Sequence, residues 1–276
     1  MTTTVPFGLA EQTEIAAYTD FMTGAASPLR EALGISSLHV GSALALAIRK
    51  DPSRFFNKAG GFGAGEPITG EVVAQVCDFY RQQGVSQGAL MVAPPLQPPH
   101  WAAIADELNL TPGNRLVKLG CDIESTLSAA DGVAALDPGL RVGPVEPHHA
   151  QEWATVMMTT FGFTTPGMID MAASCVGRPN WRQYAVWEDE RIIAVGSVFF
   201  NGLCADVFGG ATLPEGRSRG AQSALLTARA RAALAAGCRW LVAETGAEAP
   251  HNTSLHNMLR AGLEPLYERL TWLWRE

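Results

Sequence analysis

The chain has 276 residues, of which 47% are hydrophobic and 17% are charged, and its 27 acidic and 20 basic side chains give a formal net charge of −7. That length suits two compact domains with buried cores. The acidic balance argues against a nucleic-acid partner, because neutralising phosphates requires a basic surface. No apolar run approaches the ~18 residues that span a bilayer, and the first residues lack the regions of a signal peptide. We therefore expect a cytoplasmic protein with no membrane partner.

The cysteines are scattered singly along the chain, with no C-x-x-C pair and an odd total: Cys77, Cys121, Cys175, Cys204 and Cys238. This pattern is typical of small buried hydrophobic residues in a reducing compartment. We expect neither a disulfide framework nor a metal site.

In chain order, the first half predicts a Gly-Gly strand end and a Pro-containing loop within residues 56–69. A helix follows and is expected to end at Gly84, because glycine is the usual residue just past a helix C-terminus. An apolar strand then precedes a short helix over residues 98–110 and a further strand over 114–122.

The second half begins after a stretch rich in Gly, Pro and small residues, residues 125–147, where we place a domain boundary near Ala130. A strand over 140–145 precedes a helix opened at Pro147 and a second helix over 165–176. The segments 181–189 and 191–202 predict a hairpin across an acidic turn, and 204–212 predicts the next strand.

Residues 212–245 predict a strand end, a loop, a long helix and another strand. Gly220 has no side chain to keep a ligand away from the backbone, and the following helix presents free N–H groups and the positive end of its dipole. Arg217 and Arg219 add positive charge beside that helix end. The simplest interpretation is a pyrophosphate site, although neither a Walker loop nor a G-x-G-x-x-G string follows this strand.

The long helix of this segment is rich in alanine. Its apolar residues recur at spacings of four, three and four, which predicts one buried stripe opposite a polar side. The predicted stripe consists of Ala221, Leu225, Ala228 and Ala232, and the polar side of Ser223, Thr227 and Arg231.

The loop resembles the acetyl-coenzyme-A loop of GNAT-superfamily N-acetyltransferases, whose pattern is [RQ]-x-x-G-x-[GA]. The matching residues are Arg217-Ser218-Arg219-Gly220-Ala221-Gln222, with Gln222 in place of the final small residue. The upstream residues 212–215 and the downstream residues 252–274 also resemble the family, from about Leu140 to the C-terminus. The resemblance implies acetyl-CoA as co-substrate and no metal. It implies coenzyme contacts at Ala211, Thr212, Leu213, Arg217, Ser218, Arg219, Gly220, Ala221, Gln222, Asn252 and Asn257, although Asn252 is equally a helix cap.

The two halves repeat the same order of elements at similar spacing, which indicates two copies of one fold. We expect an α/β (α+β) protein with two GNAT-like units, each a mixed, mostly antiparallel sheet flanked by helices. Residues 1–130 would form a degenerate unit and 131–276 the acetyltransferase unit. The first copy carries Glu66 and Glu71 where the second carries arginine, and two carboxylates would repel a diphosphate.

The resemblance implies direct attack of an amine on the thioester. An alkylammonium with a pKa of about 10.4 must first lose a proton at pH 7, which costs about 4.6 kcal/mol, so a general base is expected to help. Glu244 and Asp206 are the candidates for that base. The family usually has a tyrosine as proton donor at the position of Met258, which cannot donate a proton. Three options follow: water protonates the thiolate, Ser254 or Tyr267 replaces the tyrosine, or turnover is poor.

The resulting prediction is an acetyl-CoA-dependent N-acetyltransferase for a small-molecule amine, acting as a monomer or homodimer. Use of a longer acyl-CoA stays open, because the sequence does not reveal the acyl pocket. The alternative is a non-catalytic acyl-CoA-binding or sensing protein, which Met258 and the degenerate first unit favour.

Overall fold

The computed structural model describes residues 4–129, 135–247 and 252–276, which fall into two compact units. Unit N contains residues 6–118, 245–247 and 265–276, and unit C contains residues 4–5, 119–129, 135–244 and 252–264. The expected boundary near residue 130 lies outside the described residues, so the linear division stays a prediction. The units differ from that division at the C-terminal end, where residues 265–276 group with the N-terminal half.

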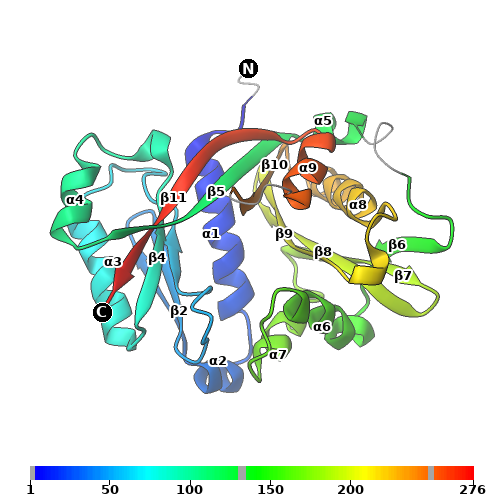
Figure 1. Cartoon of the computed structure of the whole chain (residues 1–276), viewed down its shortest axis with the longest axis horizontal. Coiled ribbons are helices and arrows are strands. Elements are labelled where there is room, and N and C mark those ends of the chain that lie inside the picture. Colours follow the sequence, from blue (N-terminus) through cyan, green and yellow to red (C-terminus); the bar gives the residue numbers. More distant parts are fainter. Residues whose placement is uncertain (1–3, 130–134, 248–251) are drawn as a thin grey trace. The chain divides into compact units, whose positions relative to one another are not determined.

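Unit N is a mixed sheet flanked by helices, with strand order β1-β2-β3-β4-β11-β5 (Figure 1). The β1–β2, β2–β3 and β4–β11 pairs are antiparallel, and the β3–β4 pair is parallel. Its strands are β1 (Ile35–Val40), β2 (Ala43–Ile48), β3 (Lys58–Gly60), β4 (Gln87–Met91), β11 (Glu264–Arg275) and β5 (Thr111–Asp122), the last of which continues into unit C. Its helices are α1 (Phe7–Thr23), α2 (Ser27–Leu33), α3 (Gly70–Gln83), η1 (Pro94–Leu96) and α4 (Trp101–Glu107).

The C-terminal strand β11 lies beside β4, a strand of the first sequence copy (Figure 1). Trp274 of β11 stacks on Tyr80 of α3, with ring centroids 5.8 Å apart, and Trp272 contacts Trp101 of α4 edge-on at 5.5 Å. Aromatic burial of this kind stabilises the strand in the core of unit N. The C-terminal strand of the second copy therefore belongs to unit N, which the order of elements along the chain did not reveal.

A buried ionic cluster joins α1 to β5 and β11 within unit N. Glu14 accepts hydrogen bonds from Lys118 Nζ at 2.8 Å and from Arg269 Nη2 at 2.7 Å. Glu11 accepts hydrogen bonds from Arg269 and from the Tyr267 hydroxyl. All four charged side chains are buried, and charges are tolerated inside a protein when they are paired in this way.

Unit C has strand order β10-β9-β8-β7-β6, with every pair antiparallel except β9 and β10. Its strands are β6 (Leu140–Pro144), β7 (Trp181–Glu188), β8 (Arg191–Asn201), β9 (Cys204–Thr212) and β10 (Trp240–Gly246). Its helices are α5 (Ile123–Ala129), η3 (Pro147–His149), α6 (Ala150–Thr160), α7 (Met168–Ala173), η4 (Pro214–Gly216), α8 (Ala221–Ala235) and α9 (Thr253–Arg260).

Helices α6 and α8 cover opposite faces of the unit C sheet (Figure 1). On the α8 face, Ala221 and Leu225 pack against Val186 and Ile193 of the sheet. The predicted helices and strands occur in the predicted order, the structure adds α1, α2, β1, β2 and α5 to them, and the predicted fold class of mixed, mostly antiparallel sheets flanked by helices is confirmed.

Candidate functional site

The parallel strands β9 and β10 pair over only three residues. Their register runs from Cys204 opposite Trp240 to Asp206 opposite Val242, although β9 continues to Thr212 and β10 to Gly246. Among the described residues, the second half of β9, residues 207–212, therefore does not pair with β10. Its edge is open to a ligand that hydrogen-bonds to a strand backbone.

A β-bulge interrupts β9 within this open half. Val195 of β8 pairs with Ala211 and Ser197 pairs with Phe208, so Gly209 and Gly210 together face Gly196. Gly209 has a left-handed φ of 61°, and a β-carbon there would lie 2.4 Å from the Met157 sulfur of α6. Glycine is required here by both conformation and space.

The loop after β9 leads to an uncapped helix end. Gly220 is the N-cap of α8, and no side chain caps this helix. The first recorded bond at this end runs from the Ala224 N–H to the Gly220 carbonyl at 3.1 Å, so the amides of residues 221–223 have no helical acceptor. Ser218 has a left-handed φ of 60°, a conformation that helps successive N–H groups to converge on an anion.

The two loop arginines differ. Arg217 is exposed at the loop surface. Arg219 instead turns back onto the protein: its Nε donates to Asp137 at 3.0 Å, and its Nη1 lies 2.8 Å from a Glu188 oxygen. These two carboxylates raise the pKa of Arg219 through their hydrogen bonds. Arg219 therefore anchors the loop, and only Arg217 presents its charge to solvent.

Gly220 also has a different role from the expected one. Its φ is 78°, and a β-carbon on it would lie 2.3 Å from the carbonyl oxygen of Ala135. The bare face of Gly220 is thus turned toward the protein's own segment 135–137, and that contact explains the glycine without a ligand. The backbone of Asp137 completes the contact by donating to the Arg219 carbonyl at 3.1 Å.

Gln222 reaches back from the first turn of α8 to the end of β9. Its Nε2 donates to the Thr212 hydroxyl at 2.8 Å, and its Oε1 would lie 3.5 Å from a β-carbon on Gly210. Ala221 is buried in the core of the unit. The Leu213 amide donates to the Ile193 carbonyl at 2.9 Å, so this amide is not available to a ligand.

The buried stripe of α8 differs from the predicted one. Ala221 and Leu225 are buried as expected, but Ala228 and Ala232 are only half-buried, and the stripe continues through Arg229. Arg229 is 1% exposed. A β-carbon on Gly196 would lie 3.0 Å from its guanidinium carbon, so Gly196 and Gly210 leave the space that this long side chain fills.

The two candidate bases occupy different parts of the strands. Glu244 is half-buried on β10, two residues beyond the last pair with β9, whereas Asp206 is 4% exposed within the paired part. Position therefore favours Glu244 as the residue within reach of a substrate.

Helix α9 carries the remaining predicted residues. The Asn252 side chain caps the helix by accepting from the Leu255 amide at 3.0 Å, and Asn257 accepts from Arg260 at 2.5 Å. Ser254 is exposed and Met258 is half-buried. The cap accounts for Asn252 structurally, and its coenzyme contact stays a prediction.

Unit N offers a different environment at the corresponding helix. The Thr69 hydroxyl caps α3 by accepting from the Val72 amide at 3.3 Å, and Glu71 lies in the first turn. Glu66 accepts from the Ser42 amide at 2.9 Å. This helix end already has a side-chain cap and a carboxylate, which disfavour an anionic ligand.

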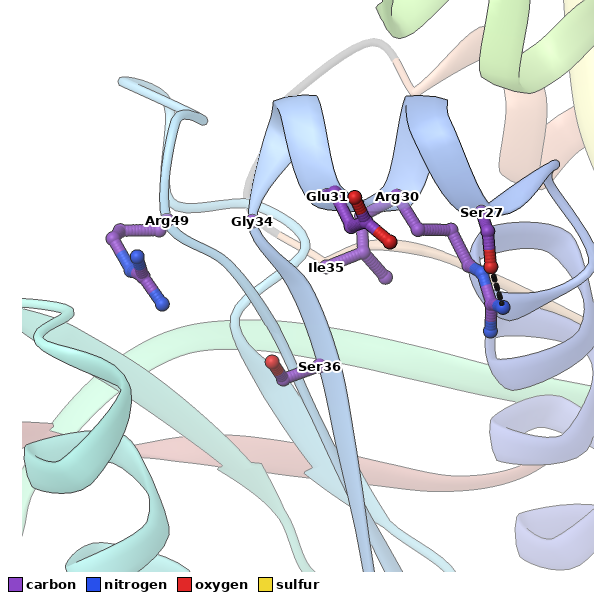
Figure 2. Close-up of a pocket in the computed structure, with 7 residues that line it drawn as sticks. All are labelled: Ser27, Arg30, Glu31, Gly34, Ile35, Ser36 and Arg49. Atoms are coloured by element: carbon purple, nitrogen blue, oxygen red, sulfur yellow. Dashed lines mark hydrogen bonds between the residues drawn. The ribbon is translucent and has the colours of Figure 1, made fainter.

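A surface pocket of about 370 Å³ lies elsewhere in unit N, at α2 and the strands beside it. Figure 2 shows that the side chains of Arg30 and Arg49 lie at opposite ends of it. Arg30 donates to Ser27 at 3.0 Å, and Arg49 donates to the Gln83 carbonyl. The two cations do not converge on one anion, and no predicted site residue lines this pocket. The full lining is Ser27, Arg30, Glu31, Gly34, Ile35, Ser36 and Arg49.

No helix among the described residues is both long and apolar enough to cross a membrane. Within residues 4–129, 135–247 and 252–276, no group of three or more His, Cys, Asp or Glu side chains is arranged to hold a metal.

No protein-family model matches the chain, and no curated protein is similar enough to count as a relative. Solved structures do match. A GCN5-related N-acetyltransferase from Kribbella flavida aligns with a TM-score of 0.63 and 16% identity, over 97% of this chain and 96% of that one. A tandem GNAT protein from the clavulanic acid biosynthesis pathway aligns with a TM-score of 0.63 and 15% identity, over 97% of this chain and 94% of that one. A third match is a protein from Novosphingobium aromaticivorans that is described as a putative acetyltransferase of the GNAT family. It aligns with a TM-score of 0.54 and 19% identity, over 98% of this chain and 100% of that one. At these identities the likeness concerns the fold, and the chain has a tandem GNAT-type fold.

Proposed function

We propose that this protein transfers an acetyl group from acetyl-CoA to the amine of a small-molecule acceptor. The observation that carries the proposal is that the β9–β10 pairing ends at Val242, and that the far end of β9, at Thr212, contacts the first turn of α8 through Gln222, where no side chain caps the helix. An open strand edge suits the amide-containing pantetheine arm, and a helix end with free amides suits the diphosphate.

The residues fit this co-substrate in part. Arg217, Ser218 and the first-turn amides of α8 would hold the diphosphate, and the backbone of Ala211 and Thr212 would contact the pantetheine arm. Arg219 and Gly220 would support the loop through segment 135–137. The amine nitrogen would form a bond to the thioester carbonyl carbon, and the carbon–sulfur bond would break with its electrons on sulfur. Glu244 would take the amine proton, directly or through water.

A thiol-release assay with acetyl-CoA and a panel of small amines tests the proposal. Release that depends on one class of amine and falls in the Arg217→Ala variant is the expected result. Coenzyme binding without thiol release on any amine would instead favour a non-catalytic acyl-CoA-binding protein. The half-buried Met258 at the expected proton-donor position is the observation that favours this alternative.

A further inference from the structure

Arg229 is a buried cation that the proposed acetyl transfer does not use. Its Nε donates to the Leu225 carbonyl at 3.0 Å, and its Nη1 donates to the Ser197 carbonyl at 3.5 Å. Nη2 makes no hydrogen bond with the described residues, and Arg229 forms no ion pair among them. A buried guanidinium normally has a carboxylate partner, because burying a charge without one is costly.

The pKa of Arg229 is consistent with this incomplete pairing. Burial lowers the pKa of Arg229 to about 10, and Asp206 offsets that effect only in part. The side chain stays protonated at neutral pH, because this value lies well above 7. The helix therefore keeps a positive charge in the interior of unit C.

The guanidinium lies at the open half of β9. A β-carbon on Gly210 would lie 3.6 Å from Nη1 and 3.8 Å from Nη2, and 3.5 Å from the Gln222 oxygen. Gly210 belongs to the bulge inside the half of β9 that runs without β10. Two polar side chains of α8, seven residues apart on one side of the helix, thus flank the glycine that directly precedes Ala211, whose backbone is proposed to contact the pantetheine arm.

We infer that Arg229 binds the carboxylate of an acyl group, so that the preferred donor is a CoA thioester of a dicarboxylic acid such as succinyl-CoA or malonyl-CoA. The inference rests on the proposed function and refines its donor. Arginine is suited to this task because its planar fork donates two parallel hydrogen bonds to one carboxylate. A neutral acyl chain at the same place would leave Nη2 without an acceptor.

Isothermal titration calorimetry of the whole chain tests this inference by comparing the affinities for succinyl-CoA and butyryl-CoA. Butyryl-CoA has the same number of acyl carbons but no carboxylate. We expect the wild type to bind succinyl-CoA at least about tenfold more tightly, the usual effect of a charge-assisted hydrogen bond. In Arg229→Met the preference should disappear. In Arg231→Met, which removes an exposed arginine of the same helix, it should persist.

The outcomes are distinguishable. Equal binding of the two thioesters by the wild type would overturn the inference without any variant, so a misfolded Arg229→Met protein would not leave it undecided. A preference that survives in a folded Arg229→Met would also overturn it. Binding of acetyl-CoA and butyryl-CoA with no gain for succinyl-CoA would leave the proposed function standing. Binding of none of these thioesters would overturn the proposed function itself.

Discussion

Arg219 and Asp137 are joined by two reciprocal contacts, one through side chains at 3.0 Å and one from the Asp137 amide to the Arg219 carbonyl at 3.1 Å. The Asp137 pKa is lowered by the Gly139 amide that donates to its carboxylate and by the Arg219 hydrogen bond. Together with the contact of Gly220 on Ala135, this pair fixes the loop before any ligand binds. Preorganisation of this kind lowers the entropy lost on binding.

Substituting Gly220 by alanine should destabilise the protein. A left-handed φ costs a residue with a β-carbon about 1–2 kcal/mol, and the overlap with the Ala135 carbonyl adds to that cost. Urea unfolding measures the change. Gly143→Ala is the control, because that β-carbon would meet only Trp187 at an ordinary 3.5 Å. Equal stability of the two variants would contradict the packing role of Gly220.

Replacing Glu244 by glutamine should lower kcat by about 10²–10⁴-fold, the usual contribution of a general base, with little change in coenzyme affinity. Asp206→Asn should act mainly on stability, because Asp206 is buried where β9 and β10 still pair. Steady-state kinetics and thermal unfolding of both variants separate the two roles. Full activity of Glu244→Gln would exclude this carboxylate as the base.

The ionic cluster of unit N should be sensitive to the loss of one partner. Glu14→Ala would leave Lys118 and Arg269 without a shared carboxylate, at a cost of about 3–5 kcal/mol. Arg115→Ala removes an exposed pair with Glu268 on the same two strands, with side chains 57% and 42% exposed, and should cost less than about 1 kcal/mol. Urea unfolding compares the two, and a similar cost for both would show that burial does not matter here.

The cysteines should be unreactive in the native protein. All five are free and buried, as the sequence predicted, and burial raises the pKa of Cys77 and of Cys121 to about 11. Because the thiolate is the nucleophile, a disulfide reagent at pH 8 should modify the thiols only after denaturation. Rapid labelling of the native protein would contradict this burial.

Local signals in the sequence were sufficient for many of the elements after residue 56 and for several of their ends. Glycine after α3, proline before α6 and the acidic turn of the hairpin all act within a few residues, and the repeated order then indicated two similar units. The loop motif likewise predicted a strand, a loop and a helix in this order, and the structure has them as β9, η4 and α8, whereas the coenzyme contacts stay a prediction.

Relationships between distant residues could not be predicted in the same way. Asp137 lies 82 residues from Arg219, and Glu11 lies 258 residues from Arg269, so no local pattern links them. The stripe of α8 was predicted through Ala228 and Ala232 because alanine is apolar. The glycines of β8 and β9 that make room for Arg229 come together with it only in the folded sheet.

The central claim is that the loop before α8 and the open half of β9 bind a CoA thioester. Isothermal titration of the wild type with acetyl-CoA tests it most directly, in parallel with Arg217→Ala and Arg219→Ala. We predict saturable binding to the wild type. Binding should weaken about tenfold or more in Arg217→Ala, because a charge-assisted hydrogen bond is lost. Arg219→Ala should reduce binding mainly by lowering thermal stability. No binding heat with the folded wild type would contradict the account.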